Sequence, residues 1–258
     1  GQPWFAWEWL WDVIFAWLHA HGGLTTVVLA SLLVISATFV LVFRMAARRC
    51  GSPLIAFVAT WLAMMLSSIH WLARPHLFTF LFTVIFYSIL ERTSQGRTRL
   101  LWLLPPLTAL WTNLHGGFLA GLVLIGAYAL GELLRAALLP DAGDRRRSLL
   151  GSRPYILAGA GCAIASFVNP YGYQLHLHIY RYLTDSALWN RIIEFMAFNF
   201  RHPAARYLEP LMVLALLAVL AAFRRGRYEH AILILFWAQA GLSSVRNIPI
   251  FAIVAAPL

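Results

Sequence analysis

Long apolar runs separated by short polar segments account for most of the chain. A helix that crosses a bilayer needs about 20 mostly apolar residues. The pattern therefore predicts an all-α, polytopic transmembrane helix bundle of about eight spans. The predicted spans are Leu24–Phe43, Pro53–His70, His76–Leu90, Leu100–Thr112 (kinked at Pro105-Pro106), Phe118–Leu139, Tyr155–Val168, Leu208–Phe223 and Tyr228–Val245. The run from Ile248 to Leu258 is too short to cross and is interpreted as a partial last span.

Two segments depart from this pattern within a single predicted domain, 1–258. Residues 1–23 are rich in tryptophan, which is enriched at membrane–water interfaces, and we expect an interfacial helix there. On that helix Glu8 and Asp12 would share a face, because they lie four residues apart. Residues 169–206 form a long polar stretch that we expect to be an outer loop.

The composition agrees with a membrane protein. The chain is 61% hydrophobic and 12% charged, whereas a soluble domain is about a quarter charged. The net charge of +10 does not indicate a nucleic-acid partner, because the arginines lie in short clusters between apolar runs. The two cysteines, Cys50 and Cys162, give no disulfide framework.

Arginine placement predicts the orientation of the spans. If the loop that holds Arg44–Arg49 is inside, strict alternation places 14 of the 20 arginines inside and 6 outside. This agrees with the positive-inside rule, which accounts for the inner arginines without a functional role. We therefore expect the loop at Arg146 to face inward and the loop at Asp185 to face outward.

A chemically mixed group of side chains falls on the outer side, which is more typical of a site than of a solvated surface. Glu8 and His115 are the candidate catalytic residues. The candidate substrate-binding residues are Arg74, His76, Asn113, Asn169, Tyr171, Glu194, Arg246 and Asn247.

The segment Leu110–Phe118 is the most informative of these. Asn113 and His115 flank Leu114 just before Gly116-Gly117, where two apolar runs meet. Polar groups near hydrocarbon are costly unless they face protein or water, so a lined cavity is favoured over a structural hairpin. Gly117 and Gly121 are expected to touch a neighbouring helix closely.

Each candidate also has a structural interpretation. Glu8 could be a solvated acid, although a general base would need partners around it. Arg74 could be a snorkelling arginine at a proline turn, but arginine also binds phosphate oxygens in a bidentate manner. Arg246 opposes the positive-inside bias, which favours function. The sequence Asn169-Pro170-Tyr171-Gly172 is a turn signal in its own right.

No cofactor is defined by the sequence. His176 and His178 alternate across Leu177, and without a third ligand nearby they are a weak metal signal. A divalent metal requirement is therefore left open.

Five short motifs in a fixed order resemble bacterial multi-pass proteins of the GT-C glycosyltransferase superfamily, which contains protein mannosyltransferases and lipid A aminoarabinose transferases. They are Gly1-Gln2-Pro3-Trp4 with Glu8-Trp9-Leu10, Arg74-Pro75-His76, Asn113-Leu114-His115-Gly116-Gly117-Phe118, Asn169-Pro170-Tyr171-Gly172 and Arg246-Asn247-Ile248-Pro249.

The resemblance implies a transferase in the bacterial inner membrane with an extracytoplasmic active face. Its donor would be a polyprenyl-phosphate-linked sugar, its partners would include membrane lipid, and an acid in the first outer loop would be catalytic. We expect this chain to be an internal fragment of a longer protein, with the first span and most of that loop preceding Gly1, so that the fragment itself could be inactive.

Two other classes are kept as alternatives. A transporter or flippase would carry charge at the membrane midplane and broken helices. A scaffold without chemistry would have its outer polar groups dispersed rather than gathered around one cavity.

Overall fold

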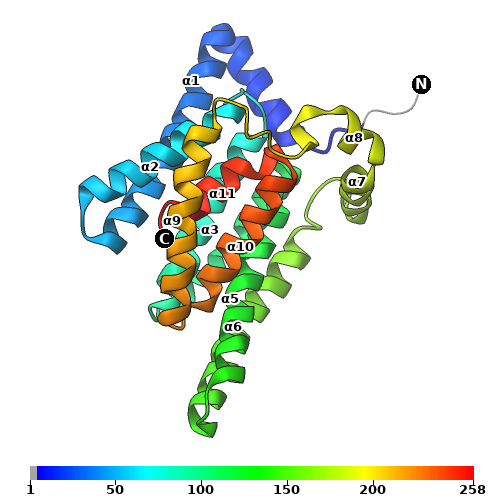
Figure 1. The fold of residues 1–258 in the computed structure, drawn as a ribbon. Helices are drawn as coiled ribbons and strands as arrows, with labels where there is room; N and C mark the ends of the chain where they lie inside the picture. Colours follow the sequence, from blue (N-terminus) through cyan, green and yellow to red (C-terminus); the bar gives the residue numbers. More distant parts are fainter. Residues whose placement is uncertain (1–4) are drawn as a thin grey trace.

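The computed structural model describes residues 5–258, with only the backbone described at 188–190. All regular structure in this part of the chain is helical, as predicted (Figure 1). The helices are α1 (Trp9–Cys50), α2 (Pro53–Ser67), η1 (Ser68–His70), α3 (His76–Ser94), η2 (Thr98–Leu103), α4 (Leu104–Leu114), η3 (Gly116–Phe118), α5 (Leu119–Leu138), α6 (Ala142–Ala165), α7 (Tyr173–Thr184), α8 (Ser186–Arg191), η4 (Ile193–Phe195), α9 (Ala205–Arg224), α10 (Tyr228–Ser243), η5 (Val245–Asn247) and α11 (Ile248–Ala255).

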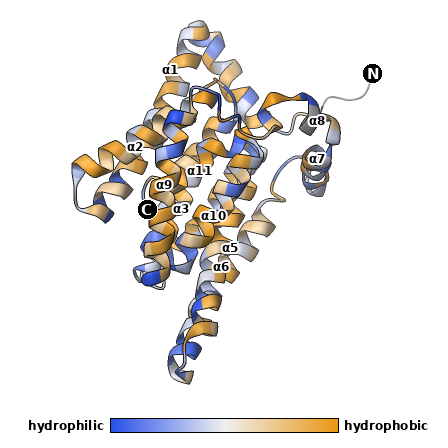
Figure 2. Ribbon diagram, viewed as in Figure 1, coloured by the Kyte–Doolittle hydropathy of each residue, from blue (hydrophilic) through white to orange (hydrophobic). Residues whose placement is uncertain are grey.

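Five segments among the described residues are long and apolar enough to cross a membrane: Trp9–Cys50, Pro53–His70, His76–Ser94, Gly116–Leu138 and Ala205–Arg224. Figure 2 shows apolar residues along the helices and hydrophilic residues concentrated toward their ends. Three of the eight predicted spans are not among the five. Helix α4 has 11 residues and α10 has 16, while α6 begins with a charged segment that includes Asp144.

The N-terminal part of the chain forms a helix that ends at Gly22-Gly23, directly before the first predicted span, as expected. The label α1 covers both helical parts, from Trp9 to Cys50, with non-helical backbone at Gly22 and Gly23 between them. Gly23 has a φ of 65°, which glycine adopts without steric cost. The Thr26 hydroxyl lies 2.7 Å from the Leu18 carbonyl oxygen and 2.9 Å from that of Gly23, so it satisfies carbonyls released by the break. In Figure 1 the two parts of α1 meet at a sharp bend at the top.

The expected kink at Pro105-Pro106 is wrong. The two prolines lie in the first turn of α4, where the missing backbone N–H would have had no partner within the helix. They therefore start the helix. Helix α4 then runs without interruption to Leu114, directly before His115.

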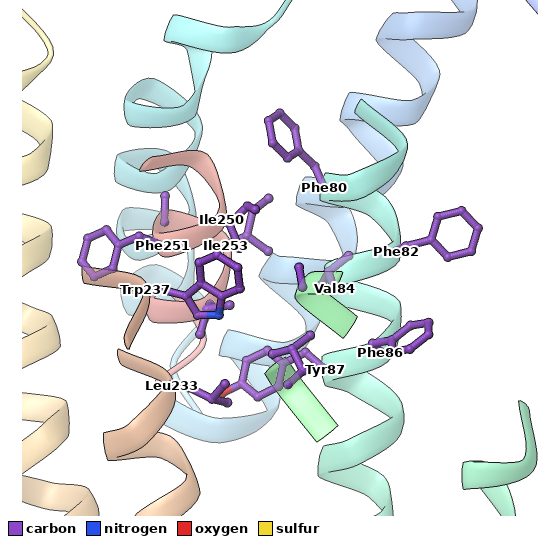
Figure 3. Packing of buried hydrophobic residues seen from close by; sticks show 14 of the residues in the cluster. Phe80, Phe82, Val84, Phe86, Tyr87, Leu233, Trp237, Ile250, Phe251 and Ile253 are labelled. Atoms are coloured by element: carbon purple, nitrogen blue, oxygen red, sulfur yellow. The ribbon is translucent and has the colours of Figure 1, made fainter. Parts of the chain in front are cut away.

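The hydrophobic core is centred on α3, α10 and α11. Figure 3 shows Phe80, Val84 and Tyr87 of α3 on the side of Trp237 and Ile250, while Phe82 and Phe86 point the other way. The eight-residue α11, which we expected to be a partial span, is buried at every position. It lies against α2, α3 and α10, so it is a core element of the described structure.

The prediction for Gly117 and Gly121 is confirmed. A Cβ atom at Gly121 would lie 2.9 Å from Phe86 of α3 and 2.9 Å from Trp111 of α4. A Cβ atom at Gly117 would overlap Thr79 of α3. The two glycines allow η3 and α5 to approach their neighbours more closely than any other residue would permit.

The predicted inner ends of several helices meet in a network of charges that the topology rule did not anticipate. The Glu91 carboxylate binds Arg49 of α1 and accepts a hydrogen bond from the Tyr128 hydroxyl of α5. It also lies 3.2 Å from Arg227 and 2.8 Å from Nε2 of His230. Because Glu91 is 7% exposed, these contacts compensate a charge that would be costly to bury alone. The network closes this end of the bundle.

Candidate active site

A cavity of about 410 Å³ lies at the opposite end, where α4–η3–α5 and α10–η5–α11 both break. Its size is that of a pocket for a small molecule. Seven of the ten predicted site residues line it: Glu8, Arg74, His76, His115, Glu194, Arg246 and Asn247. They come from five separate segments of the chain, so the fold brings together what is dispersed in sequence.

Glu8 precedes the first residue of α1, and its carboxylate faces the cavity rather than capping that helix. Burial raises its pKa from 4.5 to about 7; the charge of Asp12 also raises it, and Arg246 lowers it. A carboxyl group with such a pKa exchanges a proton readily near neutral pH. Glu8 is therefore a candidate general base, and its side chain, 19% exposed, is not that of a fully solvated acid.

His115 lies beside Glu8, with Nε2 3.4 Å from Oε1 of the carboxylate. Its other ring nitrogen, Nδ1, lies 2.6 Å from the Thr79 hydroxyl and accepts a hydrogen bond from the Gly117 N–H at 3.0 Å. Burial lowers the pKa of His115 well below its ordinary value, and His76 and Arg246 act in the same direction. The ring is therefore neutral at physiological pH.

The adjacent glycines of the Asn113–Gly117 corner have separate roles. A Cβ atom at Gly116 would lie 2.7 Å from the Trp7 ring, and one at Gly117 would lie 2.7 Å from Nδ1 of His115. Glycine at both positions lets Trp7 and His115 pack directly against the backbone. The corner is part of the cavity wall, as expected for a lined cavity.

Arg74 lies in the turn before α3 and forms an ion pair with Glu194 of η4, with Nη1 3.1 Å from Oε1. Their side chains are 56% and 38% exposed. The outer segment that carries Glu194 is held by backbone pairing, because Val245 N–H donates to the Met196 carbonyl and Phe198 N–H donates to that of Leu242. Glu194 is thus fixed near the cavity entrance.

Arg246 of η5 is the deeper cation. Its guanidinium carbon lies 4.6 Å from the centre of the Phe195 ring and 5.7 Å from that of Tyr182. Its Nη1 atom is buried and has no hydrogen-bond partner among the described residues. Burying a donor without a partner is costly, so this atom is a strong indication of an acceptor ligand in the cavity.

Two further histidines complete the polar wall. Nε2 of His76 lies 2.7 Å from the His70 carbonyl oxygen, so it carries the proton and donates. This leaves Nδ1 of a neutral His76 as an acceptor. His70 itself is 7% exposed, and its Nε2 has no partner within the described structure. The cavity therefore offers both donors and acceptors.

Asn113, Asn169 and Tyr171 are placed elsewhere. Asn113 accepts a hydrogen bond from the indole of Trp9 and donates to the carbonyls of Ala109 and Val168. Asn169 accepts from the backbone N–H of Tyr171 within its turn. The Tyr171 hydroxyl accepts from the Ala6 backbone N–H at 3.0 Å. These three residues position the segment that carries Glu8, and the turn interpretation describes the Asn169 motif.

The histidines of α7 do not form a pair. His176 bonds to the Ser166 hydroxyl at 2.8 Å, whereas His178 stacks on Phe5 with ring centroids 4.7 Å apart. No cluster of three or more metal-binding side chains occurs among the described residues. The first motif residues, Gly1-Gln2-Pro3-Trp4, lie outside the described residues.

Sequence reasoning did not include Thr79, Trp111 or His70 among the site residues. His70 and Thr79 lie at the outer ends of their helices, and this position was the one signal that could have identified them. Trp111 carried no signal, because a tryptophan in an apolar run is ordinary. In comparisons with known proteins, the chain matches no family model, no curated protein and no solved structure.

Proposed function

We propose that the protein is an integral membrane glycosyltransferase that moves a sugar from a polyprenyl-phosphate donor to an acceptor. The reaction takes place at the extracytoplasmic face of the bacterial inner membrane. The orientation rests on the arginine distribution and the chemical class on the contents of the cavity.

The observation that supports this proposal most directly is the convergence of Glu8, His115, Arg74 and Arg246 on one cavity. A scaffold has no need to gather an acid, a neutral imidazole and two guanidinium groups. The acid and the cations suit opposite ends of a glycosyl phosphate, since one removes a proton and the others stabilise the departing phosphate.

In the proposed step, Glu8 accepts the proton of an acceptor hydroxyl as that oxygen attacks the anomeric carbon. The bond between the anomeric carbon and the phosphate oxygen breaks, and the electron pair leaves with the lipid phosphate. Arg246 and Arg74 bind this growing negative charge. The new glycosidic bond forms on the face opposite the leaving group, so the anomeric configuration is inverted.

The remainder of the cavity is apolar and suits the lipid part of such a donor. It is lined by Val123 of α5, by Phe236 and Trp237 of α10, and by Ile250 of α11. Phe236 is 46% exposed, so this wall reaches the outer surface of the bundle. A polyprenyl chain would enter here while its phosphate lies at Arg246.

The test is product formation in proteoliposomes that contain the full-length protein, a polyprenyl-phosphate-linked sugar and candidate acceptor hydroxyl compounds. We expect release of polyprenyl phosphate together with a glycosylated acceptor. Glu8→Gln should abolish release while donor binding remains. Glu209→Gln is the matched control, because Glu209 is an exposed acid that does not line the cavity. Equal release by wild type and Glu8→Gln would contradict the proposal.

A transporter is the second candidate, favoured by the two helix interruptions at the cavity, η3 and η5. The same proteoliposomes separate the two classes. A transporter moves the intact lipid-linked sugar between leaflets without cleaving it. A transferase cleaves the sugar–phosphate bond and needs an acceptor.

A further inference from the structure

A chain of four side chains connects the buried core with the cavity. Trp111 is fully buried and stacks on Phe82, with ring centroids 5.2 Å apart. Its indole Nε1 donates to the Thr79 hydroxyl at 3.0 Å. That hydroxyl lies 2.6 Å from Nδ1 of His115, and Nε2 of the same ring faces Glu8.

The direction of each hydrogen bond in this chain follows from its members. An indole N–H can only donate, so the Thr79 oxygen accepts from Trp111, and its own hydrogen is free to point at Nδ1 of His115, 2.6 Å away, if that nitrogen is an acceptor. The Gly117 N–H donates to the same nitrogen. Nδ1 therefore carries no hydrogen, and the proton of the neutral ring lies on Nε2, which is 3.4 Å from Glu8.

We propose that Thr79 and Trp111 are positioning residues that hold His115 as a neutral Nε2–H donor to the carboxylate of Glu8. His115 then orients the base and does not itself take up the proton of the acceptor hydroxyl. The proton state of His115 is independent of the reaction, whereas the importance of Glu8 as a base rests on the proposed function.

A second buried threonine on the same helix provides a comparison for Thr79. Thr83 lies one turn after Thr79 and is fully buried, yet its hydroxyl has no hydrogen-bond partner within the described structure. It is the natural control, because Thr→Val at either position removes one buried hydroxyl from α3. Only at Thr79 is that hydroxyl connected to the cavity.

Two charged groups act on the Glu8 carboxyl group and would remain in place if the His115 N–H donor were lost. Asp12 and Arg246 act on the carboxyl group in opposite directions, and neither contacts Thr79 through a hydrogen bond. Removing the His115 donor therefore leaves those two charges in place. The carboxylate loses the N–H group that lies 3.4 Å from it, so its pKa rises.

The experiment is nuclear magnetic resonance of protein with ¹⁵N-labelled histidine in lipid nanodiscs, with His115→Gln used to assign the signal. The wild type should show a neutral, Nε2-protonated His115 at pH 7. The titration of Glu8 is followed in parallel by its infrared carboxyl band, assigned with Glu8→Gln. Neither measurement requires a substrate.

Thr79→Val should give a mixture of ring tautomers and raise the Glu8 midpoint, whereas Thr79→Ser and Thr83→Val should behave as wild type. A wild-type His115 that is protonated on Nδ1, or that titrates near pH 6.5, overturns the proposal even if Thr79→Val does not fold. An unchanged tautomer and an unchanged Glu8 midpoint in folded Thr79→Val also overturn it. Failure of sugar transfer alone would count against the proposed function and not against this assignment.

Discussion

Arg74 and Glu194 form an ion pair at the cavity entrance, with the guanidinium Nη1 3.1 Å from the carboxylate Oε1. Both side chains are more than a third exposed, and such pairs contribute only about 0–1 kcal/mol. The carboxylate of Glu194 thus occupies a place on Arg74 that a phosphate oxygen could take at little cost. Glu194 is expected to compete with an anionic ligand.

The first prediction follows from this competition. Glu194→Gln should increase the affinity for polyprenyl phosphate several-fold, because it removes a negative charge and releases Arg74. Glu209→Gln is the control, since Glu209 is an exposed acid that does not line the cavity. Affinities are measured by titration in nanodiscs. Unchanged or weaker binding in Glu194→Gln would show that Glu194 does not oppose the ligand.

A second prediction concerns stability and pH. Because burial raises the pKa of Glu8 from 4.5 to about 7, the folded protein holds this proton more tightly than the unfolded chain does. The resulting stabilisation is fully present below about pH 4.5 and is lost as the pH rises through 7, by up to about 3 kcal/mol. Glu8→Gln should therefore raise the Tm in detergent at pH 8.5 and leave it nearly unchanged at pH 5. An equal effect at both values would contradict the raised pKa.

A third prediction uses two glycines of α5. Gly121→Ala should destabilise the protein by about 1–3 kcal/mol, because the new methyl group would press on Phe86 and Trp111. Gly126→Ala should instead stabilise it by up to about 1 kcal/mol, since a Cβ atom at Gly126 meets nothing within 4 Å. Thermal unfolding of the two variants provides the comparison. Similar shifts for both would mean that the helix contact at Gly121 is not close.

The inner charge network gives a fourth prediction. Arg49→Gln should destabilise the protein by about 1–3 kcal/mol, because the buried Glu91 loses one charged partner and keeps Arg227, His230 and Tyr128. Arg48→Gln, at the adjacent exposed position, should change the stability by less than about 0.5 kcal/mol. If the two variants unfold at the same temperature, the network does not stabilise the bundle.

Much of the architecture was accessible from the sequence, because the length and polarity of apolar runs are set by the bilayer. The all-helical fold and five long apolar helices follow from that pattern. At α4, the predicted span is divided between η2 and a short helix that the prolines start. The pattern also located the break in α1, where Gly22-Gly23 interrupts the helical backbone.

The candidate site could be predicted only in part, because local sequence patterns do not encode long-range contacts. Arg74 and Arg246 were identifiable because they lie at helix ends where topology disfavours arginine. The tethering roles of Asn113 and Tyr171 depend on contacts with a segment more than 100 residues away, and no local pattern encodes such contacts. For the same reason, the sequence did not reveal that Glu91 pairs with Arg227.

The central claim is that Arg246 binds the phosphate of a lipid-linked sugar, and the most direct measurement is the binding of polyprenyl phosphate and of uncharged polyprenol to nanodiscs. Wild type should prefer the phosphate form, and Arg246→Ala should weaken its binding at least tenfold while leaving polyprenol binding unchanged. Arg246→Lys should restore only part of the affinity, because lysine lacks the planar fork. Equal binding of both lipids by wild type, or full phosphate affinity in Arg74→Ala and Arg246→Ala, would contradict the assignment.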